Sequence, residues 1–312
     1  RHGGPRTDSG TRDPTMIDTA LASQIEQQLL DTFTWSVDKF PLRGPDGLAT
    51  PHYGLFRSDT GDCVGPAVSA KYTPHTTEDV VTLAEAAAGA FGDGDGIQVK
   101  AHWHNGHVVT VAPSRDYRLQ VYGTDTVWPR LIIHAGYDGM PFSAQLGFFR
   151  DACRNLAMVR SAGVTTGDSI RHTYCLRERI DDLTNRFRRL TGSWDTVCET
   201  IRRLDQQELD LAEFVRDVYP LPAETTRRQR DAYVRRTDKI VRRIMRERQQ
   251  TGRPTGSPGI VTAWEAFNGV QGYVQHDAKR HGRPSEFTRA IVALRDPAVV
   301  RAHDLAMASL TA

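Results

Sequence analysis

Cysteine is scarce in this sequence, and its placement excludes two kinds of structure. Only four cysteines occur in 312 residues. No two of them form a C-x-x-C pair, which argues against a disulfide framework and against a cysteine-rich zinc site. We therefore expect reduced and mostly buried thiols at Cys63, Cys153, Cys175 and Cys198.

Long apolar runs are also missing. The hydrophobic fraction of 39% and the charged fraction of 25% are ordinary for a globular protein. No apolar stretch approaches the roughly 20 residues that span a bilayer, and the N-terminus lacks the charged head and apolar middle of a secretion signal. The sequence thus predicts a soluble, cytoplasmic protein without a membrane partner.

The common catalytic and nucleotide-binding motifs are absent as well. The sequence contains no G-x-x-x-x-G-K-[ST], no G-x-S-x-G and no H-E-x-x-H. The net charge is only +2, so any attraction to nucleic acid must come from a local basic region. These absences favour a binding protein over an enzyme.

What is present predicts an α+β chain in three parts. Residues 1–15 are rich in Gly, Pro and Arg without an apolar period, and we expect a disordered tail. Residues 16–165 predict an antiparallel β-meander with flanking helices. Residues 166–312 change to a helical period and predict a mainly helical region that packs on the sheet or follows it.

Individual elements follow from local patterns in the first half. Apolar residues at helical spacing predict a helix over 17–30, and a second helix is expected after Pro74, capped by Thr76 or Thr77. Alternation predicts a hairpin of 52–58 with 63–69. Asn105-Gly106 is suited to the positive φ angles of a type I′ turn. The meander is expected to use 97–103, 107–113, 117–123, 130–136 and 141–149.

Three stretches resemble one family. They are VGPAVSAKYTPHTTEDVVTLAEAA at 64–87, IIHAGYDGMPFSAQLGFFRDACRNLA at 132–157 and VTAWEAFNGVQGYVQHDAKRHG at 261–282. Together they resemble the phage/plasmid-like protein family, also called domain of unknown function 932. The resemblance implies a protein encoded on phages, plasmids or other mobile elements, and it implies no particular activity.

Three histidines are the candidates for a metal site. In a strand His102 and His104 share one face, and His107 lies across the Asn-Gly turn from them. One interpretation is a transition-metal site, because neutral imidazole is a common ligand. The other is a polar hairpin face, which we favour because no carboxylate or thiol stands in register. No other cofactor is expected.

The strongest basic feature is the segment 225–253. It contains eleven Lys or Arg and three Asp or Glu, a local charge of 11 − 3 = +8. Its helical period separates an apolar row from basic positions. Such a helix binds nucleic acid, pairs with acidic groups or is simply solvated. The basic candidates here are Arg228, Arg235 and Arg242, with the pair Arg236 and Arg243 elsewhere on the helix.

Three further arginines lie where elements begin or end. Arg150 and Arg154 lie where the strand pattern changes to a helical one. Polar side chains at such a place either bind a phosphate or form hydrogen bonds with the backbone groups at the helix end. Arg171 opens the helical half. Aromatic side chains would supplement the charge by stacking on bases, although each is also suited to a core. These aromatic candidates are Trp103, Tyr117, Tyr122 and Trp128.

The leading functional hypothesis is therefore a DNA-binding protein of a mobile element that handles single strands in annealing or recombination. One alternative is a metal-dependent enzyme acting on nucleic acid, in which His102, His104 and His107 contribute to the metal centre together with Asp138. Another is a regulatory or host-interaction protein whose basic helix binds an acidic partner. The sequence leaves a homo-oligomer open.

Overall fold

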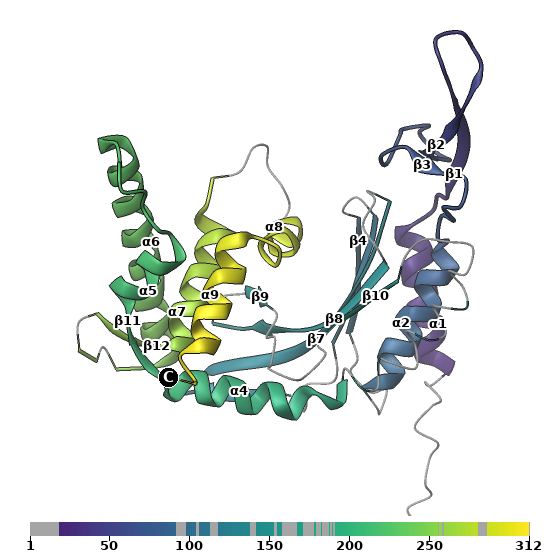
Figure 1. Cartoon of the computed structure of the whole chain (residues 1–312). Coiled ribbons are helices and arrows are strands. Elements are labelled where there is room, and N and C mark those ends of the chain that lie inside the picture. Colours follow the sequence, from purple (N-terminus) through teal and green to yellow (C-terminus); the bar gives the residue numbers. More distant parts are fainter. Residues whose placement is uncertain are drawn as a thin grey trace, which may run out of the picture.

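The computed structural model shows an α+β protein in which a large antiparallel sheet lies between two N-terminal helices and a group of C-terminal helices (Figure 1). It confirms the expected fold class. The residues that it describes are 19–91, 98–103, 106–112, 118–137, 142–152, 155–157, 167–170, 178, 182, 187, 189, 191–254, 256–257, 259–279 and 286–311.

The N-terminal part begins with a confirmed helix and continues into a small sheet. Helix α1 (Thr19–Thr32) is followed by an antiparallel sheet of β1 (Val37–Arg43), β2 (Ala49–Arg57) and β3 (Val68–Ser69). The expected hairpin of 52–58 with 63–69 is confirmed, since His52 pairs with Ser69, Tyr53 with Val68 and Phe56 with Cys63. The strand β1, which pairs with the other edge of β2, was not predicted. Pro66 lacks an N–H donor, which disfavours a longer second strand.

Helix α2 (Thr77–Ala90) forms where the sequence predicts it. The Thr76 hydroxyl accepts from the Asp79 backbone N–H, and the Asp79 carboxylate accepts from the Thr76 backbone N–H. This capping box satisfies two N–H groups that a helix start leaves open. Val80, Leu83 and Ala87 are fully buried, so the apolar face that the sequence predicts packs into the core.

Within the described ranges the main sheet has seven strands, all antiparallel to their neighbours. Its order is β10-β8-β7-β5-β4, while β6 pairs with one end of β7 and β9 pairs with β8. The expected meander is confirmed, with β7 as the long central strand. The strands are β4 (Gln98–Trp103), β5 (Gly106–Ala112), β6 (Leu119–Tyr122), β7 (Asp125–Gly136), β8 (Phe142–Arg150), β9 (Asn155–Ala157) and β10 (Gly167–Ile170).

Both faces of this sheet are covered. Val109 and Val111 share a buried cluster with α1 and α2. Val108 and Ile132 point to the other face because side chains alternate along a strand. There they pack with Ala290 and Leu294 of the α8 region. Double coverage explains why the second half of β7 is buried throughout rather than at every second residue.

The C-terminal helices surround one buried helix, α7. All ten residues of α7 are buried, and Trp264 and Phe267 are among the largest of them. A helix buried on every side belongs to a core. The elements of this half are α4 (Trp194–Gln206), β11 (Glu208–Asp210), α5 (Leu211–Val218), α6 (Arg227–Thr251), β12 (Ile260–Thr262), α7 (Ala263–Gly272), the π-helix η1 (Tyr273–Asp277), α8 (Glu286–Ala293) and α9 (Pro297–Ala308).

The two predicted halves share a core. One cluster of buried side chains includes Val109 and Leu131 of the sheet together with Ile244 and Trp264 of the helices. The expected boundary near residue 166 and the predicted tail at 1–15 lie outside the described residues, so that division stays a prediction.

None of the helices in the described ranges has the length and apolar character that crossing a bilayer requires.

Candidate nucleic-acid interface

Helix α6 is the long basic helix that the sequence predicts. Thr226 and Gln229 form a capping box at its start. At its end Gly252 takes the left-handed conformation, with φ of 75°, and the Arg253 N–H reaches back to the Arg248 carbonyl. Such C-terminal bonds satisfy the last carbonyls of a helix. With 25 residues and about 1.5 Å of rise per residue, α6 is about 37 Å long.

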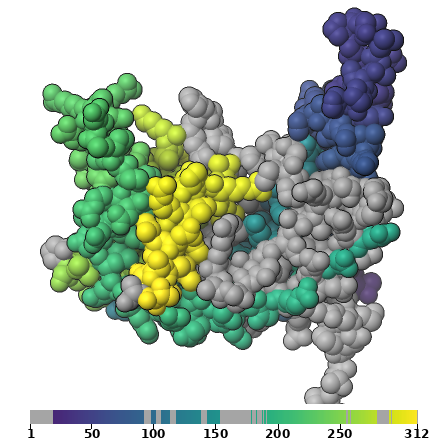
Figure 2. All heavy atoms as spheres, viewed as in Figure 1, coloured from purple at the N-terminus to yellow at the C-terminus, as the bar shows by residue number. Residues whose placement is uncertain are grey.

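The C-terminal half of α6 is fixed against α7. Ile240 and Ile244 are buried on this side of α6. They approach closely because α7 carries a glycine there: a Cβ at Gly269 would lie 2.5 Å from Cγ1 of Ile244. The N-terminal half, residues 227–239, contains no buried residue. The helix is therefore held at one end and exposed along the other, at one edge of the molecule (Figures 1 and 2).

Five basic side chains form a row along the exposed face of α6. Their positions differ by seven, four, three and four residues, so they lie on one side of the helix. The first and last members of the row are 18 positions apart, or about 27 Å along the helix. We call it the cationic row, and it consists of Arg228, Arg235, Lys239, Arg242 and Arg246, all of them exposed.

No salt bridge to a described acidic residue involves the cationic row, although other arginines of the segment are ion-paired. Arg243 contacts Asp277 at 2.7 Å, Arg248 binds Glu265 at 2.7 Å, and Arg253 binds Asp205 at 2.5 Å. The Arg248 guanidinium also helps to hold the pKa of Glu265 below its usual range, against the opposing effect of burial. The local charge of +8 is therefore partly neutralised within the protein. Five of the remaining cations form the cationic row, and the exposed Arg227 and Arg230 lie outside it.

The sequence candidates on α6 separate accordingly. Arg228, Arg235 and Arg242 belong to the cationic row. Arg236 is half-buried, with its guanidinium 4.2 Å from the centre of the Tyr219 ring. Arg243 is engaged in the protein interior, and its side chain is only 12% exposed.

Arg150 corrects a sequence prediction. Its guanidinium donates to both oxygens of Asp125, at 2.8 Å and 2.9 Å, and to Glu247. Its side chain is 3% exposed. The Trp264 Nε1–H also donates to Asp125, at 3.3 Å. Arg150 therefore joins β7, β8, α6 and α7 at a buried junction and does not lie on a surface that DNA would reach.

The remaining arginine candidates, Arg154 and Arg171, lie outside the described residues. Both stay predictions.

In the structure His107 contacts His75, a different residue from the two, His102 and His104, that the sequence suggests. Its Nδ1 lies 2.7 Å from Nε2 of His75 in the loop before α2, and its ring stacks on Trp35. Burial lowers the pKa of His107 to about 3, so the ring is neutral near pH 7. In the register of the sheet, position 107 pairs with 103, and position 102 pairs with 108. Positions 102 and 107 thus alternate to opposite faces.

The predicted metal site is therefore only partly described. Among the residues that the structure places, no group of three His, Cys, Asp or Glu has the arrangement to hold a metal ion. His104, Asp138 and the side chain of His102 are outside that set. Sequence reasoning missed His75, whose contact with His107 joins positions 32 residues apart and leaves no periodic signal.

Two of the aromatic candidates are described in full. Tyr122 is 37% exposed, and Arg253 lies over its ring at 4.2 Å from the centre. Trp128 donates to Asp151 at 2.9 Å. Both side chains therefore make contacts within the protein. Tyr117 and the side chain of Trp103 lie outside the described part of the chain.

Comparison with known proteins gives one match. A family model with the description Domain of unknown function (DUF932) matches residues 66–305. No curated protein and no solved structure matches the chain. The matched range includes the main sheet, α6 and α7, and with them both the cationic row and the buried junction at Arg150.

Proposed function

The chain belongs to the family described as Domain of unknown function (DUF932), and from its own surface we propose that it binds DNA through α6. The observation that carries this proposal is the cationic row. Lys and Arg that contact phosphates release condensed counterions, and this release drives sequence-independent binding to nucleic acid. Five exposed cations along about 27 Å of one rigid helix match such a backbone contact.

We propose further that the DNA is single-stranded and that the protein handles it in annealing or recombination on a mobile element. The mobile-element part rests on the phage and plasmid association that the family resemblance implies. The single-strand part rests on the position of the row, which follows a projecting helix rather than a surface shaped to a duplex (Figure 1). A positively charged track along the backbone is the common feature of proteins that bind single strands.

A charge-neutralising variant tests this proposal. Changing Arg228, Arg235 and Arg242 to Gln removes three cations from the row and leaves the buried face of α6 intact. Because each phosphate contact to a single strand contributes about 0.7 to the slope of log K against log salt, we expect the slope to fall by about 2. Fluorescence anisotropy with a labelled single-stranded oligonucleotide across a salt series measures it.

A matched variant controls for net charge. Arg202, Arg203 and Arg216 are exposed arginines of α4 and α5 and are not part of the cationic row. Their replacement by Gln changes the net charge by the same amount, and the salt slope should stay that of the wild type. Equal salt slopes of DNA binding for the wild type and the α6 variant would contradict the proposal. If the protein binds no DNA but captures an acidic protein in a salt-sensitive way, the host-interaction alternative is favoured.

A further inference from the structure

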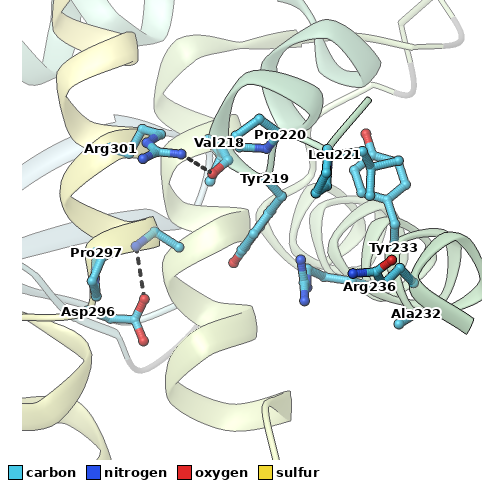
Figure 3. Close-up of a pocket in the computed structure, with 13 residues that line it drawn as sticks. Val218, Tyr219, Pro220, Leu221, Ala232, Tyr233, Arg236, Asp296, Pro297 and Arg301 are labelled. Atoms are coloured by element: carbon cyan, nitrogen blue, oxygen red, sulfur yellow. Dashed lines mark hydrogen bonds between the residues drawn. The ribbon is translucent and has the colours of Figure 1, made fainter. Parts of the chain in front are cut away.

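A cavity of about 560 Å³ opens beside the cationic row, between the end of α5, the N-terminal half of α6 and the start of α9. This volume is within the range of small-molecule sites. Tyr219 projects into its centre in Figure 3, between Asp296 and Pro297 on one side and Arg236 and Tyr233 on the other. The walls thus combine aromatic rings and proline with a small number of polar groups.

The Tyr219 hydroxyl is the most unusual group in this cavity. It is buried and has no hydrogen-bond partner among the described residues. Burial raises the pKa of Tyr219, although Arg236 opposes the effect, so the phenol keeps its proton. The ring itself offers a flat surface that carries Arg236 on one side, at 4.2 Å.

The charged groups of the cavity fit a polar ligand that is attached to a phosphate. The charged residues that line it are Arg236, Arg301 and Asp296. One oxygen of Asp296 accepts from the Ala298 N–H at 3.0 Å and caps α9, while Arg301 donates to the Val218 carbonyl at 3.4 Å. Two cations against one anion leave a net positive cavity. The second Asp296 oxygen would accept from an amino or imino group of a ligand.

The cavity is continuous with the cationic row. Gln229, Ala232 and Arg236 line the cavity, and they lie beside Arg228 and Arg235 on the adjacent side of α6. A strand whose phosphates follow the row would therefore hold its bases next to the opening. Bases in single strands are free to turn into such a site, and they stack on aromatic rings.

We infer that this cavity receives an unpaired nucleobase of a strand bound along the cationic row, with the base against Tyr219 and its edge toward Asp296. The inference rests on the proposed function and specifies its ligand: a single strand with accessible bases. The same chemistry would also accept a free mononucleotide, so the test must separate the two sources.

A variant that fills the cavity tests this inference. Ala232 is an exposed residue on the cavity wall, and Ala232→Trp would occupy the space for a base without removing a buried side chain. The ligands are an oligodeoxythymidylate of about 16 nucleotides and an abasic sugar-phosphate chain of the same length. Wild type should bind the base-bearing strand about tenfold more tightly than the abasic chain, because stacking strengthens binding. Ala232→Trp should lose this preference and keep its affinity for the abasic chain.

Val234→Trp is the matched control. Val234 is 54% exposed and is not part of the cavity wall. It lies two positions after Ala232 on α6, and two positions correspond to a rotation of about 200°, so its side chain is on the opposite side of the helix. This variant should keep the tenfold preference, and circular dichroism should show the same unfolding profile for both variants.

The outcomes separate the inference from the proposed function. No binding of either oligomer by the wild type would overturn both. Equal affinity for base-bearing and abasic strands, with normal salt dependence, would overturn the inference alone. A third outcome is that deoxythymidine monophosphate binds the wild type but not Ala232→Trp, while the wild type binds base-bearing and abasic strands equally. This outcome would overturn the inference that the cavity receives a base of a bound strand, and it would assign the cavity to free nucleotides.

Discussion

Replacing Arg150 with Met is expected to destabilise the protein by about 3–5 kcal/mol. The change removes a cation that lies between Asp125 and Glu247, whose side chains are 2% and 6% exposed. Glu247 keeps a contact with Arg243 at 3.7 Å, whereas Asp125 loses the guanidinium that it binds with both oxygens. Breaking a buried ion pair leaves an uncompensated charge away from water, which costs far more than the pair contributes when intact. Urea denaturation followed by circular dichroism gives the free energy of unfolding.

Arg216→Met provides the comparison for an exposed pair. Arg216 contacts Glu213 at 3.4 Å, and both side chains are more than 60% exposed. Exposed pairs of this kind contribute about 0–1 kcal/mol. Equal losses for Arg150→Met and Arg216→Met would show that the buried junction is not what holds β8 to α6 and α7.

A second variant separates charge from packing at the same junction. Combining Arg150→Met with Asp125→Asn and Glu247→Gln removes the stranded charges together with the cation. The triple variant should recover part of the loss seen in Arg150→Met, because neutral amides are less costly to bury than carboxylates. A triple variant less stable than Arg150→Met would mean that the loss of stability comes from the packing and hydrogen bonds of these side chains rather than from uncompensated charge.

The junction at Arg150 also shows where sequence reasoning ended. The strand to which Arg150 belongs was predictable from alternation, but its partners lie 25 and 97 residues away. One signal was present in the sequence: Glu247 continues the apolar row of Ile240 and Ile244 at helical spacing. An acidic residue in an apolar row predicts a buried cation on another element, although it does not say which one.

Elements with strong local signals were predicted well. The α2 capping residues, the antiparallel pairing of β4 with β5 and the long basic helix α6 all depend on neighbours within a few positions. In the small N-terminal sheet, the hairpin of β2 with the segment that ends in β3 was predictable from its strand pattern and Gly-containing turn. The pairing of β1 with the other edge of β2 was not, because it depends on contacts that periodicity does not encode. Likewise, helical spacing placed the arginines of α6 on different faces, and only the tertiary structure shows which face meets Asp277.

Gly106→Ala is expected to cost about 2–5 kcal/mol, and the reason differs from the one that the sequence suggests. The Asn-Gly pair predicts a turn residue, yet Gly106 already belongs to β5 and pairs with Gly136 of β7. Its φ is 155°. A Cβ at this position would lie 2.3 Å from the Ala135 carbonyl oxygen and 2.4 Å from the Gly136 Cα. Both obstacles are backbone atoms of the central strand, so neither moves without disturbing the sheet.

Gly47→Ala separates backbone strain from this steric conflict. Gly47 also has a positive φ, 77°, but it lies between β1 and β2, and a Cβ added there would meet no atom within 4 Å. Its replacement should therefore cost only the strain of a left-handed residue, about 1–2 kcal/mol. Chemical denaturation of the two variants in parallel measures the difference. If Gly106→Ala lost no more stability than Gly47→Ala, the close approach of β5 to β7 would have no energetic role, and the glycine would be required for its conformation alone.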